Sequence, residues 1–283
     1  MAMSPRLLRP RTGGLHPEAA DWRSRVIANG GTVSASTVQA VDRFCRSIDS
    51  AGIRDRFYRL NLFCGSDLSA CLVPLYRGQS RTGTQFGNTT DTNNNFVSGD
   101  YSLSGSAAGL TGNGTTKYLA TGVAQTYAGS NEIHVAMGFV PNTAAGYQCA
   151  IGARYNVANS VAVEVRGSNA NLRIAAFSGG NALSAYSPSA GRNSFISHAV
   201  NPAANSYEAW IRGVSFDTRT LGAYNSASTA NFLVFAGDSN GTASALFSGS
   251  SDFYSIGLRF TSSAQLTAYH NATEAFRTAL GRV

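Results

Sequence analysis

Charged residues are scarce in this 283-residue chain. Only 13% of its residues are Asp, Glu, Lys or Arg, and Lys117 is its one lysine. Globular proteins usually carry about a quarter of their residues as charged side chains. Serine, threonine, asparagine and 30 glycines stand in their place. This polar, uncharged and turn-rich composition disfavours long, solvent-exposed charged helices and is typical of many short strands.

The chain also lacks the residue clusters that hold metals. Cys45, Cys64, Cys71 and Cys149 form no C-x-x-C pair, and no histidine stands near them at the spacing of zinc ligands. The sequence therefore predicts no metal and no cofactor. A disulfide between Cys64 and Cys71 is one option, but Cys45 and Cys64 each follow a phenylalanine in an apolar run, which favours buried free thiols.

Enzyme motifs are absent as well. The sequence contains no phosphate-binding loop, no H-E-x-x-H, no G-x-S-x-G and no EF-hand loop. Glycoside hydrolysis requires two carboxylates facing each other across a cleft. Glu132, Glu164 and Glu208 instead fall singly in strand-like runs, so no catalytic residue is predicted and the chain is interpreted as a non-enzyme. A polysaccharide-degrading enzyme, with Glu164 and Glu208 as its pair, is the least favoured alternative.

Long apolar runs are missing too. No run approaches the roughly 18 residues that a membrane span needs, and no charged stretch leads into the short apolar stretch of a secretion signal. We therefore expect neither membrane insertion nor secretion.

The charge that is present is placed unevenly. Residues 1–81 hold twelve arginines against six acidic residues, whereas residues 82–283 hold ten basic against nine acidic residues. A basic segment of this kind predicts contact with an acidic protein surface, and the alternative is that its arginines make ordinary ion pairs within the chain. Nucleic acid is disfavoured because no aromatic residues interleave with the arginines. The candidate docking residues are Arg6, Arg9, Arg11, Trp22, Arg56 and Arg59.

The basic part has the pattern of a small helical segment. Residues 1–15 are predicted to form an extended arm, and Pro17 starts a helix that ends at Gly30 and Gly31. A second helix is predicted from Ser36 or Thr37 to about Ser50, because its apolar residues recur at helical spacing. Residues 53–76 are interpreted as helix and turn fragments. Residues 16–78 together form the predicted docking segment, and residues 79–84 form a linker.

Short strands are predicted throughout the domain at 85–283. They are 119–123, 132–140, 148–155, 160–166, 172–177, 194–200, 232–236 and 250–259, together with a hairpin of 206–212 and 214–221 that turns near Gly213. Period-two alternation directs Tyr207, Ala209 and Ile211 to one face of that hairpin, and the sandwich is expected to be built around it. A final helix runs from Ser262 to Gly281.

One polar run could bind a ligand. Residues 87–95 read Gly-Asn-Thr-Thr-Asp-Thr-Asn-Asn-Asn, and their oxygens could serve a sugar or a calcium ion. Asp91, Asn93 and Asn95 are the candidate glycan contacts, with Trp210 or Tyr207 as aromatic rings that could stack on a sugar. A turn-rich connector is the favoured alternative.

Several stretches carry a family resemblance. The sequences at 112–122, 132–139, 206–214 and 253–261, with 276–282 after them, resemble the concanavalin A-like, laminin-G-like domains of tailed-phage structural proteins over about residues 85–283. Residues 29–34, 56–65 and 72–78 also resemble phage virion proteins.

The resemblance implies a mainly β protein: a two-layer concanavalin A-like jelly-roll sandwich, preceded by a small α-helical segment and closed by a C-terminal helix. It implies a multi-copy structural protein of the virion, located in the capsid, neck, tail or fibre, whose partners are other virion proteins. The alternative is a glycan-binding module for host adhesion. The hydrolase members carry a Glu-x-Asp-x-x-Glu strand that this chain lacks, and no acidic and Asn cluster of a calcium-dependent lectin is evident.

Overall fold

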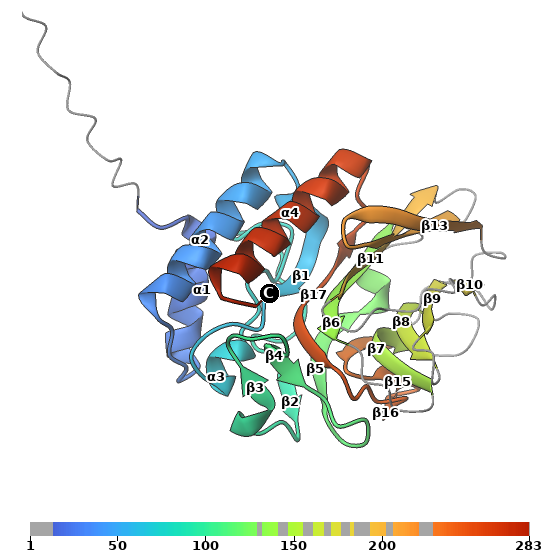
Figure 1. Cartoon of the computed structure of the whole chain (residues 1–283), viewed down its shortest axis with the longest axis horizontal. Coiled ribbons are helices and arrows are strands. Elements are labelled where there is room, and N and C mark those ends of the chain that lie inside the picture. The colour runs from blue at the N-terminus through green and yellow to red at the C-terminus, as the bar shows by residue number, and fades with distance from the viewer. Residues whose placement is uncertain are drawn as a thin grey trace, which may run out of the picture.

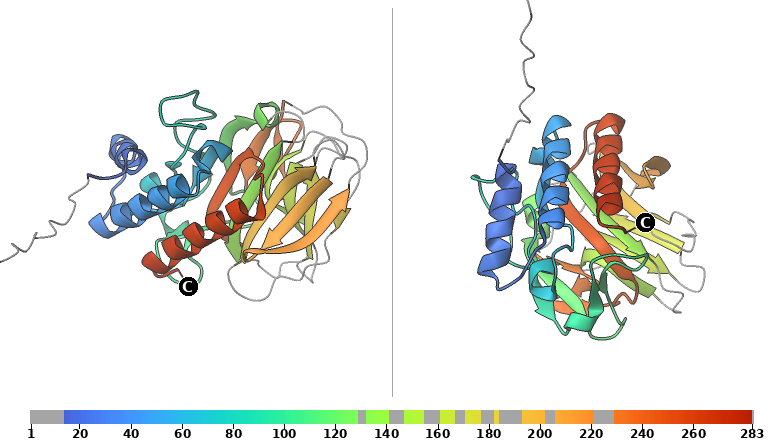
Figure 2. Two further views of the ribbon diagram at one scale, coloured as in Figure 1. Left: turned by 90° about the horizontal axis from the view of Figure 1, so that it is seen from above. Right: turned by 60° about the vertical axis from the view of Figure 1, so that its left-hand side comes forward.

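The computed structural model describes residues 14–128, 132–140, 147–154, 161–166, 171–176, 182–183, 193–201, 206–220 and 229–282. Two β-sheets pack face to face, and a layer of helices covers the outer face of one of them (Figures 1 and 2). The prediction of a mainly β, jelly-roll-like sandwich with helices at its two ends is confirmed. The helices are α1 (Pro17–Ala28), α2 (Ala35–Ser50), α3 (Leu68–Cys71) and α4 (Ser263–Ala279), with 3₁₀ turns at Arg54–Arg56, Ser98–Asp100 and Gln125–Ala128.

The sheet under the helices is called sheet A. Its strands run in the order β13 (Val214–Thr220), β12 (Ser206–Ile211), β11 (Asn193–Asn201), β6 (Ile133–Val140), β17 (Ser250–Leu258), β4 (Gly109–Thr111) and β3 (Tyr101–Ser102), and β1 (Phe57–Asn61) also pairs with β17.

The opposite sheet is called sheet B. Its order is β10 (Ala182–Leu183), β9 (Asn171–Ala176), β8 (Val161–Arg166), β7 (Tyr147–Arg154), β14 (Asn231–Val234), β5 (Tyr118–Ala124) and β2 (Thr92–Asn94), and β15 (Gly237–Ser239) joins β7 and β16 (Thr242–Ser244).

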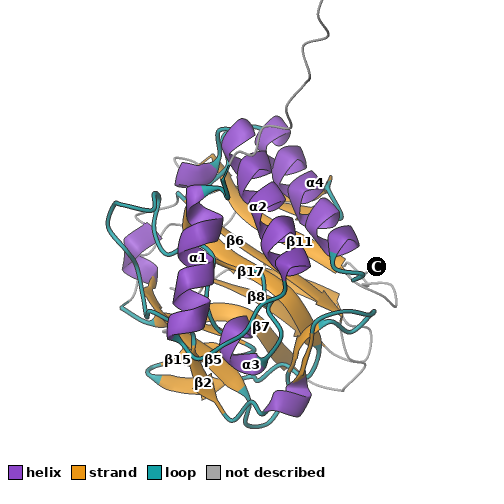
Figure 3. Ribbon diagram, turned by 90° about the vertical axis from the view of Figure 1, so that its left-hand side faces the viewer, coloured by secondary structure: helices purple, strands orange, loops and turns teal. Residues whose placement is uncertain are grey.

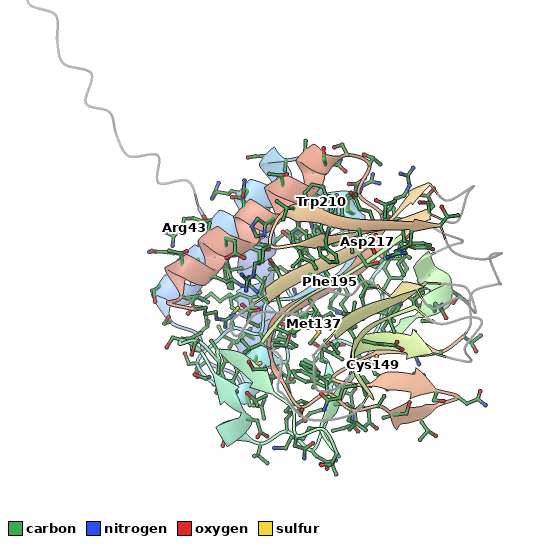
Figure 4. All side chains as sticks on the ribbon, turned by 45° about the vertical axis from the view of Figure 1, so that its right-hand side comes forward. Arg43, Met137, Cys149, Phe195, Trp210 and Asp217 are labelled. Atoms are coloured by element: carbon green, nitrogen blue, oxygen red, sulfur yellow. The ribbon has the colours of Figure 1, made fainter. Side chains whose placement is uncertain are left out.

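Each face of sheet A borders its own apolar core. Alternate residues of β6, such as Val135 and Met137, point toward sheet B and belong to one apolar core with Val163 of β8. Figure 4 labels Met137 and Phe195 between the sheets. The side chains that point the other way, such as Ala136 of β6 and Trp210 of β12, belong to a second core beneath the helices. Because side chains alternate between the two faces of a strand, sheet A has two buried faces. The molecule therefore has three stacked layers: sheet B, sheet A and the helices.

Local signals set the helix ends. The imidazole of His16 accepts a hydrogen bond from the Glu18 N–H at the start of α1, and Ser34 accepts one from Thr37 N at 3.1 Å at the start of α2. Ser262 caps α4, and Gly281 follows it with φ +65°. The predicted helices are confirmed, with α2 starting slightly earlier than expected because Ser34 is its cap.

The hairpin of β12 and β13 is confirmed, but its place in the fold is not. Arg212 and Gly213 form the turn with φ of +51° and +79°, the conformation that a two-residue turn between right-twisted strands requires. The expectation that the sandwich is built around the hairpin is wrong. Among the described strands β13 lies at the edge of sheet A, and β6 and β17, which pair along most of their length, lie at its centre.

Residues 53–76 are not only helix and turn fragments as the sequence suggested. Phe57–Asn61 forms β1, which pairs antiparallel with β17 of sheet A, and all five of its residues are buried. The segment before residue 79 therefore contributes a strand to the sandwich as well as helices. Figure 3 shows α1, α2 and α4 lying across the strands of this sheet.

Candidate functional site

Two predicted docking residues lie in the interior. Arg59 is 0% exposed, and Trp22 is 1% exposed with its indole N–H donating to the Val73 carbonyl at 3.1 Å. Both predictions are wrong, because an interior side chain cannot meet a partner surface. Arg56 lies nearer the surface, where it pairs with Asp55 at 2.6 Å. Arg6, Arg9 and Arg11 lie outside the described residues.

Arg59 has a structural role instead. Its guanidinium donates to Asp91 Oδ1 through Nε at 2.9 Å and Nη2 at 2.7 Å, and neither side chain is exposed. Tyr254 of β17 donates to the same carboxylate oxygen at 2.6 Å, and Asn61 donates to the other at 2.8 Å. Burial, and next the charge of Asp91, raises the pKa of Tyr254 well above its ordinary value, so the phenol keeps the proton that it donates.

The network also explains the polar run at 87–95. Arg59 Nη1 donates to the carbonyls of Phe86 and Asn88 at 3.2 and 3.0 Å, so the run is tied to β1 at both its start and Asp91. Asp91 is 1% exposed, and its selection as a glycan contact is wrong because its oxygens are committed to this interior network.

The two asparagines of that run that were predicted to contact a glycan, Asn93 and Asn95, are exposed, but their side-chain amides bond to the backbone. Asn93 accepts from Phe96 N and donates to Phe96 O, both at 2.9 Å, which closes a turn. Asn95 has φ +67° and donates to the Thr116 carbonyl at 2.9 Å. These bonds are those of a turn-rich connector, the alternative that the sequence favoured.

A serine and a histidine meet beneath the helices. His134 Nε2 lies 2.9 Å from Ser255 Oγ, and its Nδ1 lies 2.7 Å from the Leu258 carbonyl, which fixes the proton on Nδ1. Tyr269 of α4 donates to Ser255 Oγ at 3.0 Å. The distances match those of a nucleophile and its base. All three side chains are 0% exposed, so no substrate reaches them, and they fasten α4 to sheet A.

The cysteines are equally enclosed. All four are free and buried, as the preferred interpretation of the sequence had it. Burial raises the pKa of the Cys64 thiol to about 12 and that of Cys45 to about 12, so both remain protonated at neutral pH. A protonated, enclosed thiol is a poor nucleophile and a poor metal ligand.

The carboxylates considered for glycoside hydrolysis lie on different sheets. Glu164 is on β8 of sheet B, on the face opposite to Val163, which points into the inter-sheet core. Glu208 is on β12 of sheet A, where it accepts a hydrogen bond from Ser215 on the helix-bearing side. The whole sandwich separates the two side chains, so they cannot act as one catalytic pair.

Other proposed ligand contacts are also interior. Trp210 and Tyr207 are 7% and 3% exposed, because the helical layer covers the first and sheet B covers the second, so neither can stack on a sugar. Within the described ranges, no three His, Cys, Asp or Glu residues gather as metal ligands would. None of the described helices combines the length and apolarity that crossing a membrane requires.

A surface feature that none of these predictions named is a hollow in the helical layer. We call it the helical groove. It lies between α2 and α4, has a volume of 330 Å³, and is lined by Ala40, Arg43, Phe44, Arg46, Ser47, Ala272, Ala275, Phe276 and Ala279. The rings of Phe44 and Phe276 meet edge to face at 5.9 Å beneath it. Sequence reasoning missed the groove because it needs α2 and α4 side by side, although they are more than 200 residues apart in the chain.

Comparisons with known proteins agree with the fold. No protein-family description and no curated protein matches the sequence. The binding domain of botulinum neurotoxin serotype D is similar in structure at 9% identity, with a TM-score of 0.55 over 78% of this chain and 52% of that one. The carbohydrate-binding module CBM40 of the Ruminococcus gnavus IT-sialidase matches 50% of this chain and 84% of its own, at 12% identity and a TM-score of 0.41.

A third match covers a small part of a larger enzyme. NanB sialidase from Streptococcus pneumoniae, in its K499G form, aligns at 15% identity and a TM-score of 0.40 over 48% of this chain. The chain spans only 23% of that protein's length. At 9% identity and a TM-score of 0.55 the neurotoxin binding domain supports the fold alone, and the other two matches have TM-scores below 0.5.

Proposed function

We propose that this chain is a non-enzymatic structural component of a tailed-bacteriophage virion, which docks through its helical side and displays the β-sandwich. The observation that carries the non-enzymatic part is the placement of reactive groups. The Ser255–His134 pair and the four cysteines are enclosed in cores, and Glu164 and Glu208 lie on opposite sides of the sandwich. The virion setting is supported by the sequence resemblance.

The structure changes how docking is pictured. The proposed docking segment and the displayed domain share an apolar core, and β1 of the segment pairs with β17 of the domain. We therefore treat them as two faces of one packed body rather than as two modules on a linker. We therefore propose that the partners, other virion proteins in a multi-copy assembly, meet the outer surface of α1, α2 and α4. The arginines at 6, 9 and 11 would extend that contact.

Mass spectrometry of density-gradient-purified particles tests this role. The chain should co-migrate with particles in a fixed ratio to the major capsid protein. Replacing residues 2–13 by a glycine-serine stretch of equal length removes three arginines and leaves every described element intact, and it should strongly reduce incorporation. Absence of the wild-type chain from purified particles would sink the proposal.

A glycan-binding adhesion module is the second candidate. It is favoured by the likeness to a toxin binding domain, which covers 78% of this chain. The contacts first considered for it are largely interior, so a sugar would have to meet other surfaces of the sandwich. A glycan array probed with the purified protein, with and without calcium, tests this candidate. Dose-dependent binding would support it, and a blank array under both conditions would remove it.

A further inference from the structure

We infer that the helical groove is a docking site for an acidic amphipathic helix of another protein chain. The inference deepens the proposed structural role, on which it rests, by stating the chemistry of the partner. The floor of the groove is apolar, since Phe44 and Phe276 lie beneath it and Ala275 and Ala279 line its α4 side. Both alanines are exposed, so their methyl groups are accessible to a partner.

The shape of the groove suits a helix. Alanines at 272, 275 and 279 follow the spacing of three and four residues that keeps side chains on one helix face. They extend along α4 for about 10 Å at 1.5 Å per residue, or roughly two turns. Side chains this small allow a neighbouring helix axis to approach closely, because interaxial distance is set by the residues at the contact.

The charged residues at the edge of the groove, which we call its rim, are Arg43 and Arg46, and they indicate the charge that a partner must carry. Arg43 is exposed, and within the described part of the chain it forms no ion pair; Figure 4 shows it on the outer surface of the helical layer. Arg46 beside it is 50% exposed and shares its charge with Asp42 at 2.8 Å. On the α4 side Glu274 pairs with Arg277 at 2.5 Å, Arg277 also pairs with the buried Asp252 at 2.7 Å, and none of these three residues lines the groove. Arg43 and Arg46 line the groove and no acidic residue does, so the lining is positively charged, and the charge of Arg43 has no partner among the described residues.

A second groove continues the same pattern. It measures 230 Å³, lies on the other flank of α2, and is lined by Leu15, Arg23, Val33, Ala35, Val38 and Gln39. Arg23 is exposed and has no ion pair with the described residues. An apolar floor with an uncompensated arginine thus recurs on both sides of α2. Arginine is enriched at protein interfaces, whereas lysine and acidic residues are depleted there.

Charge also disfavours α1 or α2 of a second copy of this chain as the partner. Asp21 and Asp49, the exposed acids of α1 and α2, are already paired with Arg25 and His16. Residues 1–13 contain three arginines and no acid, so they carry the same sign as the rim. The occupant that fits is a foreign helix with an apolar stripe flanked by carboxylates, the helix-in-groove mode of recognition.

The test uses the purified full-length chain and a stapled helical peptide of about 16 residues, long enough to hold a helix when stapled. The peptide carries a leucine and alanine stripe flanked by glutamates, and a matched peptide carries lysines in their place. Fluorescence anisotropy should show binding of the glutamate peptide that weakens with salt. Arg43→Glu and Ala275→Trp should each weaken binding about tenfold or more, by reversing the rim charge and by filling the groove.

Arg81→Glu is the control, because it makes the same change of charge at an exposed arginine outside the groove. It should bind as the wild type does. Circular dichroism of each variant should be unchanged, since all three altered residues are exposed. Equal binding of the lysine peptide, no binding of the glutamate peptide, or wild-type affinity of both groove variants would each overturn the inference. The assay needs no particle, so its failure is distinguishable from absence of the chain from virions.

Discussion

Replacing Asp91 by alanine should unfold this protein at a much lower temperature than a surface substitution of the same kind. Asp91 and Arg59 are both fully buried and share bonds at 2.7 and 2.9 Å. Removing the carboxylate leaves the guanidinium without its counter-charge and also takes the acceptor from Tyr254 and Asn61. Breaking one side of a buried ion pair typically costs about 3–5 kcal/mol.

The matched control is Asp55→Ala. Asp55 also pairs with an arginine, at 2.6 Å, but its side chain is 52% exposed, and exposed pairs contribute at most about 1 kcal/mol. In a protein of this size each kcal/mol shifts the midpoint of thermal unfolding by about 2–4 °C, so Asp91→Ala should lower it by roughly 6–20 °C.

Differential scanning calorimetry and urea denaturation measure both variants. The wild type and Asp91→Ala should each unfold in a single transition, because the helical layer and sheet A share an apolar core and β1 pairs with β17 in both proteins. A loss of less than about 1 kcal/mol in Asp91→Ala, or separate transitions for the helical layer and the sandwich, would refute this reasoning.

Four further predictions follow from the same packing. A fragment of residues 79–283 should be insoluble or unfolded in circular dichroism, because it lacks β1 and exposes the helix-bearing face of sheet A; a soluble, folded fragment would show two separable modules. In urea titrations Gly213→Ala should lower the free energy of unfolding by about 1–3 kcal/mol more than the control Gly241→Ala. Both glycines have a positive φ, but only at 213 would the new Cβ lie 2.2 Å from His270. Equal losses of stability would contradict this. Thiol titration at pH 8 should find no fast-reacting cysteine in the native protein and four after denaturation, and fewer than four would indicate a disulfide. Because burial raises the pKa of the Cys64 thiol from 9.0 to about 12, the unfolded state loses this proton first, and stability should fall as the pH rises from 9.0 toward 12.

Much of the sandwich could be predicted from the sequence because its strands alternate visibly. The runs that became β6, β8 and β12 place an apolar residue at every second position, and their boundaries differ from the predicted ones by at most a residue or two. The hairpin turn was recognisable because glycine at 213 tolerates the positive φ that the turn needs.

The strand β1 was not predictable in the same way. It reads Phe-Tyr-Arg-Leu-Asn, and all five residues are buried, so the polar ones do not mark a solvent face. Its arginine is tolerated inside only because Asp91, 32 residues further on, neutralises it. A buried charge depends on a partner that no local pattern reveals, which is why Arg59 was taken for a surface cation and Asp91 for a surface ligand.

The candidate surface was missed for a related reason. The arginines of α2 were recognised as excess charge in the sequence, but the alanines of α4 have no signal of their own. They form a groove only where sheet A brings the two helices together.

An electron cryomicroscopy map of the tailed-phage particle proposed to carry this chain tests the central claim most directly. The account predicts multiple copies of the three-layered body, with the outer surface of α1, α2 and α4 packed against another virion protein and the sandwich displayed away from it. A particle without density for this chain, or copies whose helical layer faces solvent while the sandwich makes the contacts, would contradict the account.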